Sequence, residues 1–272
     1  MKNLSSRIIS AFIALVVLIL AVYFGREKGI YVFVLFAVIR GSFEVARMFF
    51  TADYPPFIKR LFVTLSTVVF LIVTQESLRF ISAIAIILSF VLVASLGIVF
   101  HRHFKSLDQI LTFVAKTCLG LVYTCFLPAV VVWTSQSNNG TKWFLCLLAV
   151  VFAGDIGAYI FGVNFGKTKI APLLSPNKSV EGAIGGLLFS TLVAGAFQFL
   201  LPDTSWIVLL LCGLIGGILG QIGDFFESLI KRVSGVKDSG SIMPGHGGVL
   251  DRLDGVLLAA PLFYLAATYF SL

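Results

Sequence analysis

The sequence predicts an all-α fold, a polytopic integral membrane bundle of about nine transmembrane helices. Of the 272 residues, 58% are hydrophobic and only 12% are charged, and the mean hydropathy is +1.02. A soluble domain usually carries about 25% charged residues, because it must cover itself with polar surface. Apolar runs of roughly 17 to 25 residues, long enough to cross a hydrocarbon core as helices, recur along nearly the whole chain. These runs leave no room for a separate soluble domain.

Each span is placed by its apolar run, and the first run needs a further argument. Residues 8–24 follow two basic residues, as the apolar part of a signal peptide would, but the segment Gly25 to Lys28 comes next instead of a small-residue cleavage site. We therefore expect a retained first span. The expected spans are residues 8–24, 29–50, 58–75, 80–100, 110–133, 142–163, 181–201, 206–230 and 249–270.

The basic residues are divided unequally between the two sides of this bundle. With an odd number of spans, the N-terminus shares a side with the loops after every second span. Of the 20 Lys and Arg residues, fourteen lie on that side; the others are Arg26, Lys28, Arg79 and Lys142 on the opposite side and Arg40 and Lys116 inside spans. Positive residues favour the cytoplasmic side. We expect a multi-pass protein of the inner (cytoplasmic) membrane with its N-terminus in the cytoplasm.

Two loops on the predicted cytoplasmic side are longer and more polar than the rest, Asn164 to Val180 and Val233 to Gly248. We expect residues 1–135 to form five spans that act as a scaffold, and residues 136–272 to form a catalytic region of four spans that carries both loops. A transporter would concentrate its unusual residues near the middle of the membrane. Here they gather at one face.

Acidic residues flank the second polar loop at helical spacings. Asp224, Glu227 and Lys231 are spaced i, i+3, i+7 and so share one helix face. Asp251 and Asp254 repeat the spacing at the start of the last span. Singly, each charge could mark a solvated helix end, but Asp224 follows a long apolar run and needs a partner at that depth. Carboxylates on facing helix ends are suitable ligands for Mg²⁺, which binds through one or two of them plus phosphate and water.

The same loop carries cations and glycines suited to phosphate groups. Gly247 and Gly248 follow His246 just before a helix, where backbone N–H groups approach an anion closely. Although the net charge is +7, the basic residues lie in short loops instead of along one polar face. Anionic lipid or phosphate ligands explain them better than nucleic acid does. The cations placed to meet phosphate are Lys231, Arg232, Lys237 and Arg252.

The first polar loop forms a second group of polar residues together with the helix before it. Asp155 and Tyr159 lie one helical turn apart in the sixth span, where an Asp–Tyr hydrogen bond between helices is the alternative to a role in binding. Ser175-Pro176 indicates a turn, and Glu181 falls in the first turn of the seventh span, where the helix dipole favours a carboxylate.

These motifs resemble a known family. The segment Ser228 to Asp254 is similar to the signature of the phosphatidate cytidylyltransferases, also called CDP-diacylglycerol synthases, in which Ser, Lys-Arg, Lys-Asp, His-Gly-Gly and Asp-Arg-x-Asp recur at these spacings. Met243 stands where Leu, Ile or Phe is usual. The segment Ser175 to Gly182 resembles the family's Ser-Pro-Lys-Lys-Thr-x-Glu-Gly motif, with Asn177 and Ser179 as departures. The resemblance is specific over about the last 120 residues.

The resemblance implies roles for individual residues. The metal ligands would be Asp224 and Asp251. The catalytic set is Asp224, Asp251, Lys231, Lys237 and His246, and the substrate-binding set is Lys178, Glu181, Arg232, Asp238, Arg252, Asp254 and Asp155.

The activity that the resemblance implies is the Mg²⁺-dependent reaction of CTP with phosphatidic acid to give CDP-diacylglycerol and pyrophosphate. The partners would be these two substrates and membrane lipid, without nucleic acid. The sequence leaves open a second cation and a homodimer. It also leaves two other functions open. A CTP-dependent polyprenol or lipid kinase would share much of the phosphate site, and a secondary transporter would account for Arg40, Lys116 and Asp155 within spans.

Overall fold

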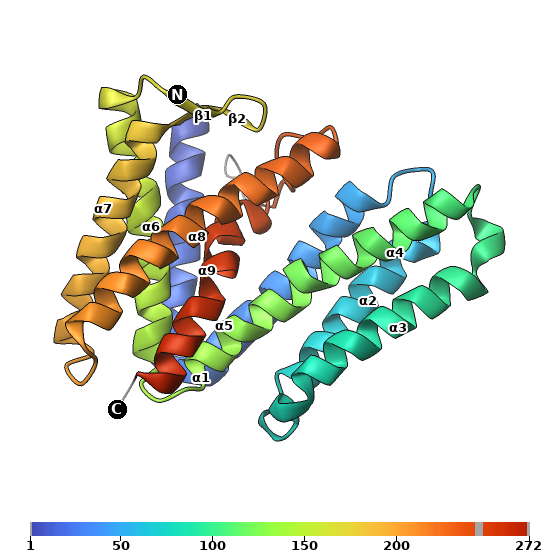
Figure 1. The fold of residues 1–272 in the computed structure, drawn as a ribbon, viewed down its shortest axis with the longest axis horizontal. Helices are drawn as coiled ribbons and strands as arrows, with labels where there is room; N and C mark the ends of the chain where they lie inside the picture. Colours follow the sequence, from blue (N-terminus) through green and yellow to red (C-terminus); the bar gives the residue numbers. More distant parts are fainter. Residues whose placement is uncertain (1, 243–246, 271–272) are drawn as a thin grey trace. The chain divides into compact units, whose positions relative to one another are not determined.

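The structure is a computed structural model that describes residues 2–242 and 247–270. It is almost entirely helical, as the sequence predicts, and Figure 1 shows the order of its helices and strands. The helical elements are α1 (Lys2–Phe49), α2 (Pro56–Val73), η1 (Glu76–Ile81), α3 (Ser82–Val99), η2 (His101–His103), α4 (Leu107–Leu121), η3 (Val122–Phe126), α5 (Leu127–Ser135), α6 (Gly140–Phe165), α7 (Val180–Ala196), η4 (Phe197–Phe199), α8 (Trp206–Val233) and α9 (Leu250–Tyr269).

Seven helical segments in the described part of the chain are long and apolar enough to cross a membrane. The expected count of nine is not confirmed, for two reasons. The first two expected spans form one helix, α1, which is interrupted only at Arg26 (φ 45°, ψ −127°). The last expected span exists as α9 but carries Asp251, Arg252 and Asp254 near its start. The protein is therefore a polytopic helical membrane protein.

The chain forms two compact units. The first comprises residues 1–31 and 130–272, and the second comprises residues 32–129. The proposed roles of residues 1–135 as scaffold and 136–272 as catalytic region concern function and stay predictions.

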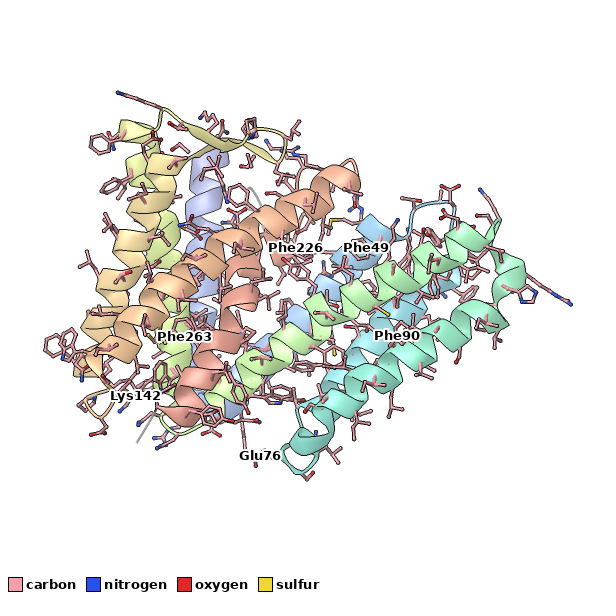
Figure 2. The ribbon with its side chains drawn as sticks, viewed as in Figure 1. Phe49, Glu76, Phe90, Lys142, Phe226 and Phe263 are labelled. Carbon is pink, nitrogen blue, oxygen red and sulfur yellow. The ribbon has the colours of Figure 1, made fainter. Side chains whose placement is uncertain are left out.

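The first unit is built on close contact between α6, α7, α8 and α9. At the crossing of α8 and α9, a Cβ atom on Gly223 would lie 2.3 Å from the Asp254 carbonyl oxygen, so only glycine permits this approach. Further along α9, Phe263 (labelled in Figure 2) is fully buried. Its ring meets the ring of Trp143 of α6 edge-on, with 6.4 Å between the ring centres. A glycine thus lets α8 and α9 approach closely, and an aromatic contact joins α6 to α9.

The second unit is tied together by a short polar chain inside apolar helices. Ser42 donates to Ser66 over 2.8 Å, and the hydroxyls of Ser66 and Thr124 lie 3.0 Å apart. All three side chains are buried, and Thr124 lies in the π-helical turn η3. By contrast, Phe90 of α3 is 54% exposed (Figure 2), as expected for a side chain that faces lipid.

The loop between α6 and α7 contains a hairpin that the sequence interpretation missed. Strands β1 (Lys169–Ala171) and β2 (Ser175–Ser179) pair antiparallel, with Lys169 opposite Ser179 and Ala171 opposite Ser175. Within the described residues this is the only sheet. Pro176 had indicated a turn, but a proline is tolerated on the edge of a two-stranded sheet, where its missing N–H is not needed.

Candidate active site

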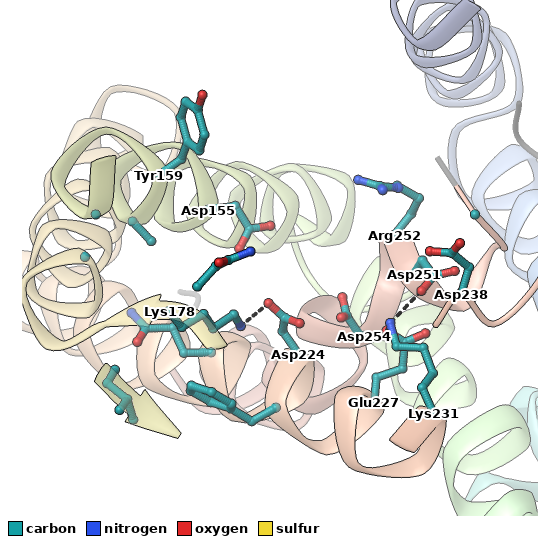
Figure 3. A pocket seen from close by; sticks show the side chains of 18 of the residues that line it. Asp155, Tyr159, Lys178, Asp224, Glu227, Lys231, Asp238, Asp251, Arg252 and Asp254 are labelled. Carbon is teal, nitrogen blue, oxygen red and sulfur yellow. Dashed lines mark hydrogen bonds and ion pairs between the residues drawn. The ribbon is translucent and has the colours of Figure 1, made fainter. Parts of the chain in front are cut away.

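A pocket of about 1220 Å³ lies within the first unit, at the ends of α6, α7 and α8 that carry the polar loops. Its walls come from α6, the β1–β2 hairpin, α7, α8, the loop after α8 and the start of α9 (Figure 3). Pockets for one small ligand typically measure roughly 300–1,000 Å³. This pocket therefore has room for more than one substrate group.

Carboxylates from three helices face the pocket. Asp155 of α6, Asp224 of α8 and Asp254 of α9 turn toward a common space (Figure 3). Asp155 lies close enough to the other two for their charges to act on it, and the cations Lys178 and Arg252 act on it in the opposite sense. The fold thus concentrates negative charge where like charges repel, so the group needs cations nearby.

Lys178 supplies one of those cations. It projects from β2, and its ammonium pairs with Asp224 Oδ2 (Figure 3). The same ammonium lies 4.3 Å from the centre of the Phe225 ring, in cation–π contact. The side chains of Lys178 and Asp224 are 29% and 34% exposed, so the pair is accessible from the pocket.

Lys231 is engaged on the opposite side of the site. Its ammonium donates to Glu227 Oε2 over 2.7 Å and to Asp251 Oδ1 over 2.6 Å. The Glu227 side chain is 1% exposed and the Asp251 side chain 8% exposed, so Lys231 neutralises two buried carboxylates. The lysine therefore ties the end of α8 to the start of α9.

Asp251 organises the loop that follows α8. Its Oδ2 accepts hydrogen bonds from the Ser239 N–H (2.9 Å), the Ser239 hydroxyl (2.8 Å) and the Gly248 N–H (2.7 Å). Gly247 reaches this arrangement with φ +80°, and a Cβ there would lie 2.3 Å from Asp251 Oδ2. Glycine is therefore required at this position, and both oxygens of Asp251 have protein donors.

Glu227 and Asp254 form a second place in the pocket that could hold a divalent cation. Glu227 Oε1 is buried with no donor among the residues described here, and the carboxylate interacts with that of Asp254. Two adjacent carboxylates, one of them buried, need a shared proton or a cation. In residues 2–242 and 247–270, no three His, Cys, Asp or Glu side chains lie close enough together to form a complete metal site. A cation here would complete its coordination with substrate phosphate and water, as Mg²⁺ commonly does.

Most of the predicted site residues come together in this pocket, and two do not. Arg232 donates from Nε to the Leu174 carbonyl oxygen over 3.3 Å, and Glu181 accepts from the backbone of Lys167 and Thr168. Neither Arg232 nor Glu181 lines the pocket. His246 lies outside the described residues. The predicted residues that line the pocket are Asp155, Lys178, Asp224, Lys231, Lys237, Asp238, Asp251, Arg252 and Asp254.

The structure also adds residues that sequence reasoning left out of the site. Glu227 shares the helix face of Asp224 and Lys231, so its spacing was a usable signal. Phe225 lines the pocket beneath the Lys178 ammonium, and Gln221 lines it while donating to the Ala183 carbonyl oxygen over 3.0 Å. Nothing in the sequence distinguishes Ser239 from the nearby Ser241, because the role of Ser239 depends on its contact with Asp251 in the folded structure.

Comparisons with known proteins find relatives of this chain. A protein named phosphatidate cytidylyltransferase from Staphylococcus haemolyticus is 39% identical over 178 residues, 65% of each chain. Proteins with the same name from Staphylococcus aureus (strain COL) and Bacillus subtilis are 37% identical over 179 residues, 65% of each chain, and 43% identical over 134 residues, 48% of this chain and 49% of the other. The match thus spans about 65% of the first of these relatives.

The family comparison covers more of the chain than these pairwise matches do. The model of the cytidylyltransferase family matches residues 5–270, which include both units and every element that lines the pocket. The match therefore extends well beyond the segment Ser228 to Asp254, whose motif first suggested the resemblance. The chain belongs to the cytidylyltransferase family.

Proposed function

We propose that this protein is a phosphatidate cytidylyltransferase of phospholipid synthesis, which joins CTP to phosphatidic acid to give CDP-diacylglycerol and pyrophosphate. The observation that carries the proposal is the pocket that carboxylates from α6, α8 and α9 line together with the Lys178 ammonium, at the ends of membrane helices. Membership of the family and the names of the relatives support it. The pocket is large enough for a triphosphate and a lipid phosphate together.

The reaction needs positioning and charge neutralisation more than a strong base. A phosphatidate oxygen attacks the α-phosphorus of CTP, and the bond from that phosphorus to the pyrophosphate oxygen breaks. The attacking oxygen is already ionised, so no general base must remove a proton from it. Lys178, Lys237 and Arg252 line the pocket where they can hold phosphate oxygens in line. Lys231 supports the structure of the site instead of binding phosphate, because its ammonium already forms ion pairs with Glu227 and Asp251.

Mg²⁺ is part of this proposal. Asp224 and Asp254 would hold the ion, because both face the pocket and Asp254 interacts with the otherwise unsatisfied Glu227. Bound there, Mg²⁺ would neutralise the charge that develops on the leaving pyrophosphate. The role expected for Asp251 as a metal ligand stays a prediction. In this structure its carboxylate oxygens accept hydrogen bonds from the loop after α8 and from Lys231.

An isotope assay tests this function. Purified protein in detergent, given Mg²⁺, phosphatidic acid and CTP labelled with ³²P at the α-phosphate, should transfer the label to lipid and release an equal amount of pyrophosphate. A lipid kinase would leave the label in soluble CDP without pyrophosphate, and a transporter would consume no CTP. If diacylglycerol or a polyprenol is the acceptor and the label stays in soluble CDP, the protein is a lipid kinase and the proposed reaction is wrong.

The orientation in the membrane is proposed from the distribution of basic residues, with the pocket facing the cytoplasm. Leu173, at the tip of the hairpin, is 93% exposed and suits a labelling test. In a background without the native cysteines, Leu173→Cys should react with an impermeant thiol reagent only after cells are opened. Asp203→Cys, in the exposed loop at the other end of α7, should react in intact cells. The reverse pattern would place the pocket on the outer side.

A further inference from the structure

The hairpin that carries Lys178 depends on contacts outside itself. It has strands of three and five residues, and an isolated two-stranded hairpin is marginally stable at best. The Val180 N–H donates to the Thr168 carbonyl oxygen over 2.8 Å and closes the base of the hairpin. Any further contact that fixes the base of the hairpin therefore also fixes the position of β2.

Glu181 provides a second hold on the base. The Lys167 N–H donates to Glu181 Oε2 over 3.0 Å, and the Thr168 N–H lies 3.2 Å from both carboxylate oxygens. Hydrogen bonds from N–H groups to an ionised carboxylate are stronger than those to a neutral acceptor. One side chain in the first turn of α7 thus fixes the start of the hairpin, two residues before β1 begins.

The Glu181 side chain points in a different direction from the side chains of its neighbours. Lys178, Ser179, Gly182 and Ala183 all line the pocket, whereas Glu181 does not. Buried Ser179 accepts from the Gly182 N–H over 3.2 Å and caps α7 on the pocket side. Glu181 therefore points away from the substrate space, and its carboxylate is occupied by the chain's own backbone.

Lys178 is the cation that the hairpin brings to the pocket. Its ammonium lies between Asp224 and the Phe225 ring of α8, while its backbone belongs to β2. A long side chain reaches a fixed point only when its backbone is held. A displacement of the hairpin base by an ångström would move the ammonium away from Asp224 and from any phosphate beside it.

We infer that Glu181 is a positioning residue, which anchors the hairpin base through Lys167 and Thr168 and so holds the Lys178 ammonium at the phosphate site. This assignment replaces the expected role of Glu181 as a substrate ligand. Its effect on nucleotide binding rests on the proposed function, whereas the anchoring itself does not.

Proteolysis tests the anchoring without any substrate. Trypsin cleaves after Lys167 and Lys169, both of which are exposed. Glu181→Gln should raise the rate of these two cuts about five- to tenfold, because it removes charge-assisted bonds that keep the base closed. Asp108→Asn is the matched control, since it removes a first-turn carboxylate from α4, in the other unit of the chain. Mass spectrometry of the fragments identifies the cuts.

A double-mutant cycle tests whether Glu181 acts through Lys178. Lys178→Met and Glu181→Gln should each weaken CTP binding, on the order of tenfold for loss of one charged contact. The double variant should bind CTP no more weakly than Lys178→Met alone, because the anchor has nothing left to position. Glu181→Asp, which keeps the charge on a shorter side chain, should recover part of the affinity and of the resistance to trypsin.

The outcomes are separable. Unchanged cleavage in Glu181→Gln would overturn the inference, and so would losses of CTP affinity that multiply in the double variant. If Glu181→Gln does not fold, cleavage in Glu181→Asp decides the anchoring, with a rate no higher than that of Asp108→Asn counting against it. If the wild-type protein binds no CTP, the proposed function fails, and the cleavage rates still decide whether Glu181 anchors the hairpin.

Discussion

Replacing Asp224 with asparagine is expected to lower kcat for the proposed formation of CDP-diacylglycerol by about a hundredfold or more, the loss that follows when several kcal/mol of charge stabilisation disappear from a transition state. Asp224 faces the pocket, pairs with Lys178 and lies close enough to Asp254 for their charges to interact. The amide keeps the shape of the side chain but neither balances the Lys178 ammonium nor binds Mg²⁺ well.

Three measurements separate this effect from a loss of structure. The variant should elute from size exclusion and unfold like the wild type, because the Asp224 side chain is one-third exposed. Asp203→Asn, in the loop between α7 and α8, is the control and should keep full activity. Raising Mg²⁺ should restore little activity to Asp224→Asn. Near-normal turnover at limiting Mg²⁺ would remove Asp224 from the proposed metal site.

Replacing Lys231 with methionine is expected to destabilise the folded protein by about 3–5 kcal/mol, the cost of leaving buried charge without its partner. Lys231 is the cation shared by Glu227 and Asp251, whose side chains are 1% and 8% exposed. Methionine fills a similar volume but leaves both buried carboxylates without this ammonium, and Glu227 also lies close to the charge of Asp254. The loop held by Asp251 should loosen at the same time.

The chain offers a matched control for this second effect. Lys105 and Asp53 form an ion pair of similar length, 2.8 Å, but their side chains are 73% and 66% exposed. Lys105→Met should therefore cost only about 0–1 kcal/mol. Thermal unfolding in detergent compares the two variants, and adding Glu227→Gln to Lys231→Met should recover part of the loss. Equal stability of Lys231→Met and Lys105→Met would contradict the buried network described here.

Much of the architecture follows from the sequence alone, because the bilayer restricts what a chain of this composition can form. Long apolar runs must become helices in lipid, where unpaired backbone groups are costly. The expected spans 142–163 and 206–230 accordingly correspond to α6 (Gly140–Phe165) and α8 (Trp206–Val233). The helical spacing of Asp224, Glu227 and Lys231 is likewise sufficient to predict that they share one face of α8.

The tertiary structure decides which of these charges meet and what remains for a ligand. Asp155 joins Asp224 and Asp254 only because α6, α8 and α9 pack through small residues such as Gly223. Spacing along α8 allows the i,i+4 pair of Glu227 and Lys231, but it could not show that Lys231 also pairs with Asp251, since contacts between different helices depend on how the helices cross. Glu181 is a similar case, because its direction is set by the backbone N–H groups of a hairpin that no apolar pattern predicts. Periodicity along the chain determines helices and their faces, and packing in three dimensions determines the partners of each charge.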